Sequence, residues 1–218
     1  MSSVSGKTIG RLCIYRRQIQ RLKDEGKSNA FSHQLAALTG GSAAQVRRDL
    51  MAIGYSGTPY HGYIIDELAG SIGKFLDHPD GQQVALVGLG NLGRAILAYF
   101  EGRRPNLVIS AAFDIDSAKV DRVIHGCHCY RVDLLEQEVK RRGIVVGVIC
   151  VPAREAQKVA ESLVSGGVKA IVNFAPRRLH LPDNVHVEDL DMTTALEKAA
   201  FFARGGPSTG KYSTSSKQ

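Results

Sequence analysis

Three glycines stand at a spacing that suits an anion-binding turn. Gly88, Gly90 and Gly93 follow the apolar run 84–87 and precede an amphipathic helical pattern. In a strand-to-helix turn, the first glycine permits a tight bend, the second lets backbone amides approach a pyrophosphate, and the third lets helix and strand pack closely. The helix N-terminus adds unpaired N–H groups and partial positive charge. The candidate binding loop is therefore Gly88, Leu89, Gly90, Asn91, Leu92 and Gly93.

A carboxylate follows at the distance expected for a bound ribose. A second apolar run, residues 107–113, ends in Asp114, 21 residues after Gly93. A carboxylate at that strand end accepts hydrogen bonds from both ribose hydroxyls of an adenosine, which is typical of NAD rather than NADP sites. We interpret the pair of motifs as a dinucleotide or related adenine-nucleotide site. An empty structural turn is the alternative, because glycine-rich turns also occur without a ligand.

Alternating strands and helices are needed to position these residues. The pattern predicts strands 83–88, 107–113, 128–132, 144–151, 168–174 and 185–188, separated by helices 91–101, 116–124, 133–141 and 153–164. Such alternation requires a parallel sheet with helices on both faces, which binds ligands at the carboxyl ends of its strands. We therefore expect four residues at two further strand ends to line the nicotinamide side of the site: Val151, Pro152, Asn173 and Phe174.

The first quarter of the chain carries nearly all of the excess positive charge. The net charge of the 218 residues is +7, and residues 1–55 hold nine cationic and three anionic side chains, against 19 and 18 in the remainder. A basic field this concentrated is expected for a polyanion partner. A solvated basic face without a partner is the alternative.

Helical periodicity in the same quarter predicts a helix-turn-helix. A first helix over 8–26 directs one apolar set inward, namely Ile9, Leu12, Cys13, Ile19 and Leu22. Ser32 is expected to cap a second helix, and Ser42 with Gln45 to form a capping box for a third, in which Val46, Leu50 and Ile53 face inward. The residues left for the DNA major groove are Ser42, Ala43, Ala44, Gln45, Arg47 and Arg48. There Gln pairs with adenine, and Arg with guanine or phosphate. A three-helix bundle with surface arginines is the alternative.

The segments around this motif complete the expected organisation. Residues 54–63 hold three glycines and Pro59, which predicts a hairpin or wing, and a linking helix over 66–76 leads to a boundary turn at 78–81. The last helix, 192–203, is so apolar that it must dock on its own domain or on a second copy of the chain. Residues 205–218, rich in Gly, Ser and Thr, are predicted to form a disordered tail.

Cysteine usage and hydropathy narrow the class of protein. The four cysteines lack C-x-x-C spacing, so we expect reduced thiols and no metal site. Cys127-His128-Cys129 fits a short strand better than a metal site, because neighbouring strand residues point to opposite faces and no second ligand cluster exists. No apolar run approaches the roughly 18 residues of a membrane span, and no signal peptide precedes the first helix, so a cytoplasmic location is expected.

Taken together, these motifs resemble the Rex family of bacterial redox-sensing transcriptional repressors over about residues 9–204. The resemblance rests on the segments 15–17, 42–50, 88–93, 113–116, 151–153, 156–157 and 173–176. It implies an α/β fold with a winged-helix DNA-binding domain over 1–80, a Rossmann-like NAD(H) domain over 81–190 and a C-terminal helix over 191–204 that is exchanged between subunits. It also implies a homodimer without catalytic residues, which binds palindromic operator DNA when NADH is scarce and leaves DNA when NADH binds.

The resemblance further assigns switch and wing residues. Arg17 would contact the partner's Rossmann domain, and Tyr99, beside the cofactor, would bond to Asp191 of the partner subunit. Met192 stands where relatives carry an aromatic lid. In the wing, Pro59 replaces the family's arginine, so Tyr60 and His61 would have to serve the minor groove, with altered affinity or operator preference.

Two other functions remain open from the residues alone. An NAD-dependent oxidoreductase would need a proton donor or acceptor beside the nicotinamide and a substrate-holding region. The available histidines are better explained as surface residues: His125, His128, His180 and His186. A CoA- or ADP-binding module is the third possibility, because the same glycine loop serves those ligands.

Overall fold

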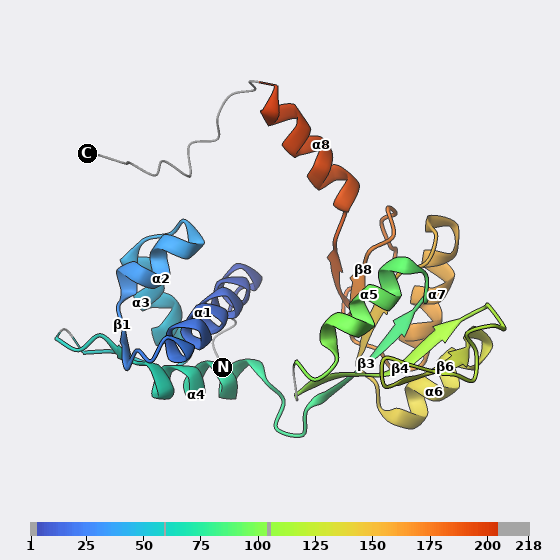
Figure 1. Cartoon of the computed structure of the whole chain (residues 1–218), viewed down its shortest axis with the longest axis horizontal. Helices are drawn as coiled ribbons and strands as arrows, with labels where there is room; N and C mark the ends of the chain where they lie inside the picture. The colour runs from blue at the N-terminus through green and yellow to red at the C-terminus, as the bar shows by residue number, and fades with distance from the viewer. Residues whose placement is uncertain (1–3, 59, 104–105, 205–218) are drawn as a thin grey trace. The chain divides into compact units, whose positions relative to one another are not determined.

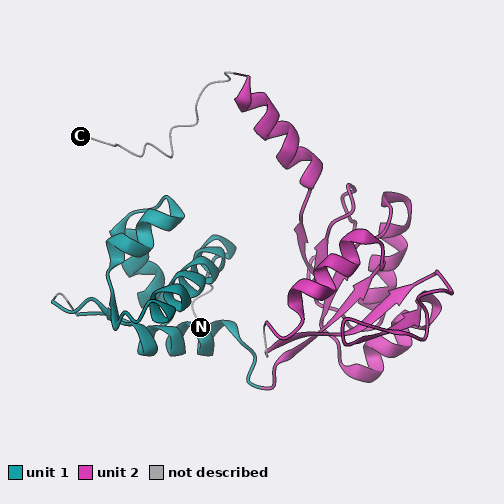
Figure 2. Ribbon diagram, in the orientation of Figure 1, with its two compact units in different colours: residues 1–79, 209–218 teal, residues 80–208 magenta. Residues whose placement is uncertain are grey.

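The computed structural model describes residues 4–58, 60–103 and 106–204, which form two compact units divided after residue 79 (Figure 2). Pro59 and the predicted tail 205–218 lie outside the described residues. Among the described residues, no helix is long and apolar enough to cross a membrane, and no cluster of His, Cys, Asp and Glu could hold a metal ion. All four cysteines are free thiols in the structure.

The first unit is a three-helix cluster with a small antiparallel sheet and a fourth helix. Its elements are α1 (Gly6–Asp24), β1 (Asn29–Ala30), α2 (Ser32–Thr39), α3 (Ala43–Ala52), β2 (Tyr63–Ile64) and α4 (Ile65–Leu76). β1 pairs with β2, and a bridge between Thr58 and Gly62 closes the predicted wing. The core is formed by Leu12, Tyr15, Ile19, Leu35, Val46, Leu50, Leu68 and Ile72. The helix-turn-helix with its wing is therefore confirmed.

Three local expectations in this unit were wrong. Ile9 and Cys13 are exposed on α1, and Tyr15 takes the inward position because it reaches a buried carboxylate on α3. The N-cap of α2 is Phe31 rather than Ser32, and the Gln34 side chain accepts the Phe31 N–H at 2.8 Å. Ser42 does cap α3 by accepting the Gln45 N–H, but the Gln45 side chain does not return the bond, because it is held elsewhere.

The second unit is a doubly wound sheet. Its elements are β3 (Gln82–Val87), α5 (Asn91–Phe100), β4 (Leu107–Asp114), β5 (Val123–Ile124), β6 (Cys127–Arg131), a 3-10 turn η1 (Val132–Leu134), α6 (Leu135–Arg142), β7 (Val146–Ile149), α7 (Ala153–Ser165), β8 (Ala170–Asn173), β9 (His186–Asp189) and α8 (Met192–Ala203). Within the described residues the strand order is β5-β6-β4-β3-β7-β8-β9, and all pairs are parallel except β5 with β6 (Figure 1). The six predicted strands are all present, and β5 is an addition.

Alternation along β3 divides the core between the two faces of the sheet. Ala85 and Val87 face α6 and α7, where Val139, Val159 and Leu163 complete one apolar cluster. Val84 and Leu86 face α5, whose Leu97 packs on the opposite cluster. The expectation of helices on both faces is confirmed (Figure 1).

The predicted helix over 116–124 is absent. One turn begins when the Asp116 carboxylate accepts the Ala118 N–H, but the backbone of Asp121 then bonds to Cys129 instead of continuing the helix. Asp121 and His125 adopt left-handed φ values of 57° and 47°, and β5 turns back on β6. Edge-strand pairing therefore replaced the helix that local periodicity indicated.

The terminal helix α8 has the predicted bounds, and none of its residues is buried. Its exposed large apolar side chains are Met192, Leu196, Phe201 and Phe202. On the α5 side of the sheet, several apolar residues of β7, β8 and the loops after them are also only partly buried, namely Val146, Cys150, Val172 and Phe174. Exchange of α8 between subunits stays a prediction.

Candidate functional site

The strand order reverses between β3 and β7, and this switch point is where doubly wound sheets bind ligands. The chain runs outward from β3 to β6, then returns to the other side of β3 and continues to β9. Register aligns the carboxyl ends, because Val87 pairs with both Phe113 and Ile149, and Ile149 pairs with Asn173. The predicted nucleotide-binding residues after β3, β4, β7 and β8 therefore lie at one edge of the sheet.

The glycine loop combines two positions that the fold requires with one that it does not. Gly88 has φ +97°, and a Cβ there would lie 2.5 Å from the carbonyl oxygen of Cys150. A Cβ on Gly93 would lie 2.0 Å from the Gly88 carbonyl oxygen. Gly90, the N-cap of α5, has an ordinary φ of −69°, and its Cβ would meet nothing within 4 Å. Open space before a helix N-terminus fits a pyrophosphate.

Asp114 fixes this loop from the neighbouring strand. Its carboxylate is 8% exposed, and Oδ2 accepts the Leu89 N–H at 2.7 Å, while Oδ1 accepts the Asp116 N–H at 2.9 Å. The Lys119 ammonium also reaches Oδ2 at 3.3 Å. A carboxylate offers about four acceptor positions. Oδ1 therefore retains room for one ribose hydroxyl, whereas Lys119 must move before Oδ2 accepts a second.

The four residues predicted at the other strand ends divide into two kinds. Val151 and Phe174 are half-buried and Pro152 is exposed, so all three present surface at this edge. Asn173 is buried, and its amide donates to the Arg177 carbonyl and to Asp189 while its oxygen accepts the Ala175 N–H. Asn173 therefore shapes the loop that carries Phe174.

In the first unit, α3 presents the predicted DNA-reading residues. Ala44, Arg47 and Arg48 are exposed, and the Ser42 cap begins the helix at Ala43. Gln45 is half-buried: its Nε2 donates to Asp49 Oδ1 at 2.8 Å, and its Oε1 accepts from Arg48 Nη2 at 2.9 Å. We call the exposed side of α3 with Ala44, Gln45, Arg47 and Arg48 the reading face. Its Gln45 side chain is held by a buried carboxylate.

That carboxylate, Asp49, joins α3 to α1. Arg11 donates to it twice, at 2.6 and 2.7 Å, and the Tyr15 hydroxyl donates at 3.0 Å. Burial alone would raise the pKa of Asp49, but the hydrogen bonds from Arg11, Gln45 and Tyr15 outweigh it and lower the pKa below its usual value. Burial and the bond to Asp49 raise the pKa of Tyr15 to about 12. Asp49 is therefore ionised at neutral pH and holds both helices together.

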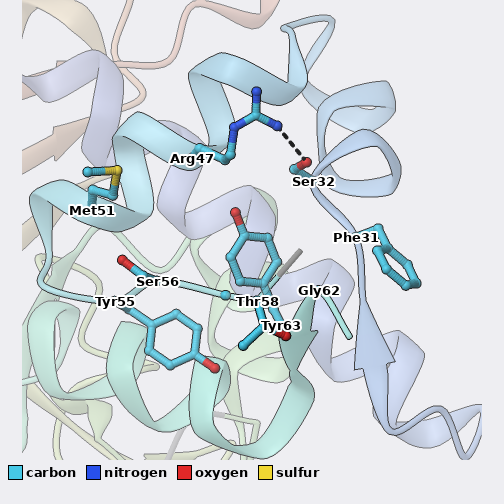
Figure 3. Close-up of a pocket in the computed structure, with 10 residues that line it drawn as sticks. Phe31, Ser32, Arg47, Met51, Tyr55, Ser56, Thr58, Gly62 and Tyr63 are labelled. Atoms are coloured by element: carbon cyan, nitrogen blue, oxygen red, sulfur yellow. Dashed lines mark hydrogen bonds between the residues drawn. The ribbon is translucent and has the colours of Figure 1, made fainter. Parts of the chain in front are cut away.

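A hollow of about 380 Å³ lies between α3 and the wing (Figure 3). Arg47 borders it and donates to the Ser32 hydroxyl at 3.3 Å, while Met51, Tyr63 and Thr58 form other parts of its wall. Beyond Thr58, the predicted wing residue Tyr60 is 89% exposed, and His61 is exposed beside it. A single guanidinium above an apolar floor suits the phosphate and sugar of a DNA backbone.

The predicted switch residues all lie on the surface. Arg17 is exposed on α1 and has no bonding partner within the described residues. Tyr99 is 59% exposed, with the Arg103 guanidinium 4.5 Å from its ring centre. Asp191 caps α8 by accepting the Thr194 N–H and hydroxyl, which lowers the pKa of its carboxyl, and Met192 follows it.

Known protein families match both units of the chain. A family profile described as "CoA binding domain" matches residues 80–177, and one described as "Putative DNA-binding protein N-terminus" matches residues 3–50. The redox-sensing transcriptional repressor Rex of Syntrophobacter fumaroxidans is 40% identical over 200 residues, which cover 91% of this chain and 95% of that protein. The chain belongs to the Rex family. Rex of Syntrophomonas wolfei is 38% identical over 195 residues, 89% of this chain and 93% of its own.

Solved structures support the same assignment to the Rex family. RSP, described as a Rex-family repressor, was crystallised with β-NAD+ and operator DNA; that structure is 30% identical, with a TM-score of 0.85 and coverage of 94% of each chain. RSP with β-NADH is 29% identical, with a TM-score of 0.81, covering 94% of this chain and 96% of that one. The fold predicted from the resemblance is confirmed, while the individual residue roles remain predictions.

Three residues of this Rex chain escaped the sequence reasoning. Asp49 and Arg11 form the support beneath the reading face, and Lys119 occupies one side of the Asp114 carboxylate. The four-residue spacing of Gln45 and Asp49 was a usable signal, because such pairs share a helix face. Arg11 gave none, since its partner Asp49 lies on a separate helix. Lys119 lies only three and five residues after its partners Asp116 and Asp114, so its spacing was a second usable signal.

Proposed function

We propose that this chain is a dimeric NADH-responsive repressor, which holds palindromic operator DNA when NADH is scarce and releases it when NADH binds. The observation that carries the proposal is the presence of both sites in one chain: a glycine loop with Asp114 at the switch point of a doubly wound sheet, and a basic helix-turn-helix with a wing.

NAD(H) suits the nucleotide site better than CoA does. Asp114 lies where a ribose would bind, and its carboxylate favours free hydroxyls. CoA carries a phosphate on that ribose, so the carboxylate and the neighbouring Asp116 would repel it. The loop residues 88–93 would hold the pyrophosphate, with Val151, Pro152, Phe174 and Tyr99 nearer the nicotinamide.

The site contributes shape and polarity rather than chemistry. NADH supplies a neutral dihydronicotinamide, whereas NAD+ carries a ring charge that is costly to enclose in apolar surroundings. Val151, Phe174 and the predicted lid Met192 would therefore favour the reduced form. We propose that the chain is a regulator rather than an enzyme, because the relatives that it matches over most of their length are named as transcriptional repressors.

DNA recognition would use α3 and the wing of each subunit. Residues 42–48 would enter the major groove, and Tyr60 and His61 would contact the minor groove in place of the arginine that relatives carry. A palindromic operator requires two copies of this DNA-binding unit at a fixed separation, so a dimer is needed. The unburied apolar side of α8, together with the incompletely covered β7 and β8, supports a dimer with exchanged α8 helices.

NADH control would follow from differential affinity between two dimer arrangements. NADH would make extra contacts in a closed dimer, in which Tyr99 bonds to Asp191 of the partner subunit and Arg17 contacts the partner's Rossmann domain. That arrangement would separate the two DNA-binding helices. Shifting a 99:1 mixture to 1:99 needs about 5.5 kcal/mol of preference. In a dimer with two nucleotide sites, each NADH would supply about half of this free energy.

A gel shift tests the proposal directly. The full chain should retard a palindromic A·T-rich duplex, and saturating NADH should abolish the retarded band while NAD+ leaves most of it. CoA at the same concentration serves as the control for the alternative nucleotide. Equal retardation with and without NADH would refute NADH control, and release by CoA alone would favour the CoA-binding alternative.

A further inference from the structure

Both polar atoms of the Gln45 amide, on the reading face of α3, are hydrogen-bonded within the protein. Its nitrogen donates to Asp49 and its oxygen accepts from Arg48, at 2.8 and 2.9 Å. A carboxylate only accepts and a guanidinium only donates, so these two partners fix which end of the amide faces which. Reading adenine would require both amide atoms to turn outward, toward N6 and N7 of the base. That rotation would break two charge-assisted bonds at once.

Asp49 cannot follow Gln45 outward. Its side chain is 2% exposed, and both of its oxygens are bound by Arg11 from α1, with a further bond from the Tyr15 hydroxyl. A buried carboxylate that lost these donors would be left without compensation. The anchor for Gln45 is therefore fixed by the core of the unit rather than by the surface helix.

The two arginines of α3 differ in what holds them. Arg48 is exposed and tied to Gln45 Oε1 through one nitrogen, which leaves most of its five N–H donors free. Arg47 points instead toward Ser32 at the hollow beside the wing (Figure 3). A guanidinium held in one orientation can pair with O6 and N7 of guanine, whereas contact with a phosphate carries no sequence information.

We propose that Gln45 is a positioning residue rather than an adenine reader. Anchored on Asp49, its amide oxygen holds the Arg48 guanidinium, and Arg48 reads guanine in the major groove while Arg47 contacts the backbone. This inference rests on the proposed function, because it requires that α3 bind operator DNA.

The test compares base discrimination with overall affinity in the full chain without NADH. Duplexes with randomised half-sites are first selected on the wild-type protein. Fluorescence anisotropy then measures Kd for the selected duplex and for copies in which each guanine in turn is 7-deazaguanine, which lacks the N7 acceptor. The proteins are wild type, Gln45→Leu, Arg48→Ala and Arg47→Ala, the last being the matched control that removes the same charge one residue away. Gln45→Met provides a second variant without the amide.

The expected result separates positioning from affinity. In the wild type, one 7-deazaguanine position should weaken binding by about 5- to 150-fold. Gln45→Leu and Gln45→Met should reduce this factor to less than about threefold without changing the salt dependence, because no phosphate contact is lost. Arg48→Ala should also remove the factor. Arg47→Ala should weaken all duplexes equally and lower the slope of log K against log salt by about 1.

Two outcomes would overturn the inference alone. In the first, Gln45→Leu retains the full loss of affinity caused by 7-deazaguanine. The second uses further copies in which each adenine in turn is 7-deazaadenine: if one of these weakens binding by the wild type but not by Gln45→Leu, Gln45 is the adenine reader. A wild-type protein that enriches no duplex would instead overturn the proposed function, on which the inference rests.

Discussion

The three glycines of the nucleotide loop are needed for different physical reasons. Gly88 and Gly93 are needed by the protein itself, because a side chain at either position would collide with backbone. Gly90 has an ordinary backbone conformation and open space at its Cβ position, so the packing of the protein does not require a glycine there, whereas the close approach of a pyrophosphate does. This difference separates ligand binding from folding in a single pair of variants.

Gly90→Ala should therefore weaken NADH binding at least about tenfold, because its methyl group occupies the space where the pyrophosphate approaches. Its free energy of unfolding should change by less than about 1 kcal/mol, the cost of alanine at an N-cap. Gly93→Ala should lower both the NADH affinity and the free energy of unfolding. Isothermal titration calorimetry and urea denaturation measure them, and a Gly90→Ala protein that binds NADH like the wild type would contradict this use of the loop.

The Asp49 network is the other residue-scale feature with a measurable consequence. Because its folded-state pKa is lowered, ionised Asp49 stabilises the fold above the unfolded pKa of about 3.9, and this contribution is lost as the pH falls through the folded value. Arg11 keeps about a quarter of its side chain exposed, which reduces the stabilisation below that of a fully enclosed pair.

Asp49→Asn should accordingly cost about 2 kcal/mol of unfolding free energy at pH 7, because Arg11 and Tyr15 lose their charged acceptor. The gap from the wild type should narrow below pH 4, where the wild type also loses the charge. Urea denaturation at pH 7 and pH 3 measures both. Asp66→Asn, which removes the partner of Lys23 in an exposed pair, is the matched control and should have a smaller effect. A pH-independent gap would argue against ionic stabilisation.

At the scale of elements, α8 is a regular, capped helix, but none of its side chains is buried. The Asp191 cap and a regular 12-residue helix define its local structure, whereas its apolar residues have no core to join in the described chain. Burying a large apolar side chain is worth about 1.5–3 kcal/mol. A helix with several such side chains exposed is therefore expected to pack against a second subunit.

Leu196→Glu combined with Phe201→Glu should convert the dimer to a monomer, because both substitutions place charge in the buried interface. Operator affinity should fall at least about tenfold, because the two DNA-binding units would no longer be linked and would bind the half-sites independently. Sedimentation velocity and gel shift measure the two effects. Lys198→Glu adds negative charge to the same helix without removing apolar surface, and it should remain dimeric. A dimeric double variant would show that α8 is not the dimer contact.

At the scale of the whole molecule, the proposed function links NADH binding to operator binding. If NADH weakens operator binding by some factor, thermodynamic linkage requires that the operator weaken NADH binding by the same factor. No particular path through the protein is assumed by this equality. It holds for any arrangement of the two units, provided that both ligands bind the same dimer.

NADH affinity should therefore fall when saturating operator duplex is added, by the factor by which saturating NADH raises the operator Kd. Nucleotide fluorescence measures the first quantity and anisotropy of a labelled duplex measures the second, at one salt concentration, because DNA affinity is strongly salt-dependent. A scrambled duplex of equal length is the control. An operator that leaves NADH affinity unchanged would mean that the two sites are not coupled.

The features that could be predicted from sequence are those that short stretches encode. The order of strands and helices, the glycine loop, the bounds of α8 and the Ser42 cap depend on residues within a few positions of one another, and the fold class they imply is confirmed. Periodicity records which face of an element is buried, so it locates elements well. It does not record which distant group a polar side chain meets.

Tertiary structure decided what depends on such distant groups. The helix predicted over 116–124 gave way to β5 because the backbone at Asp121 found a partner in β6. The Gln45 amide donates to Asp49 because Arg11, on another helix, holds that carboxylate in place. Whether a polar group is free to bind a ligand depends on the hydrogen bonds it already makes, and those form only when separate elements pack together.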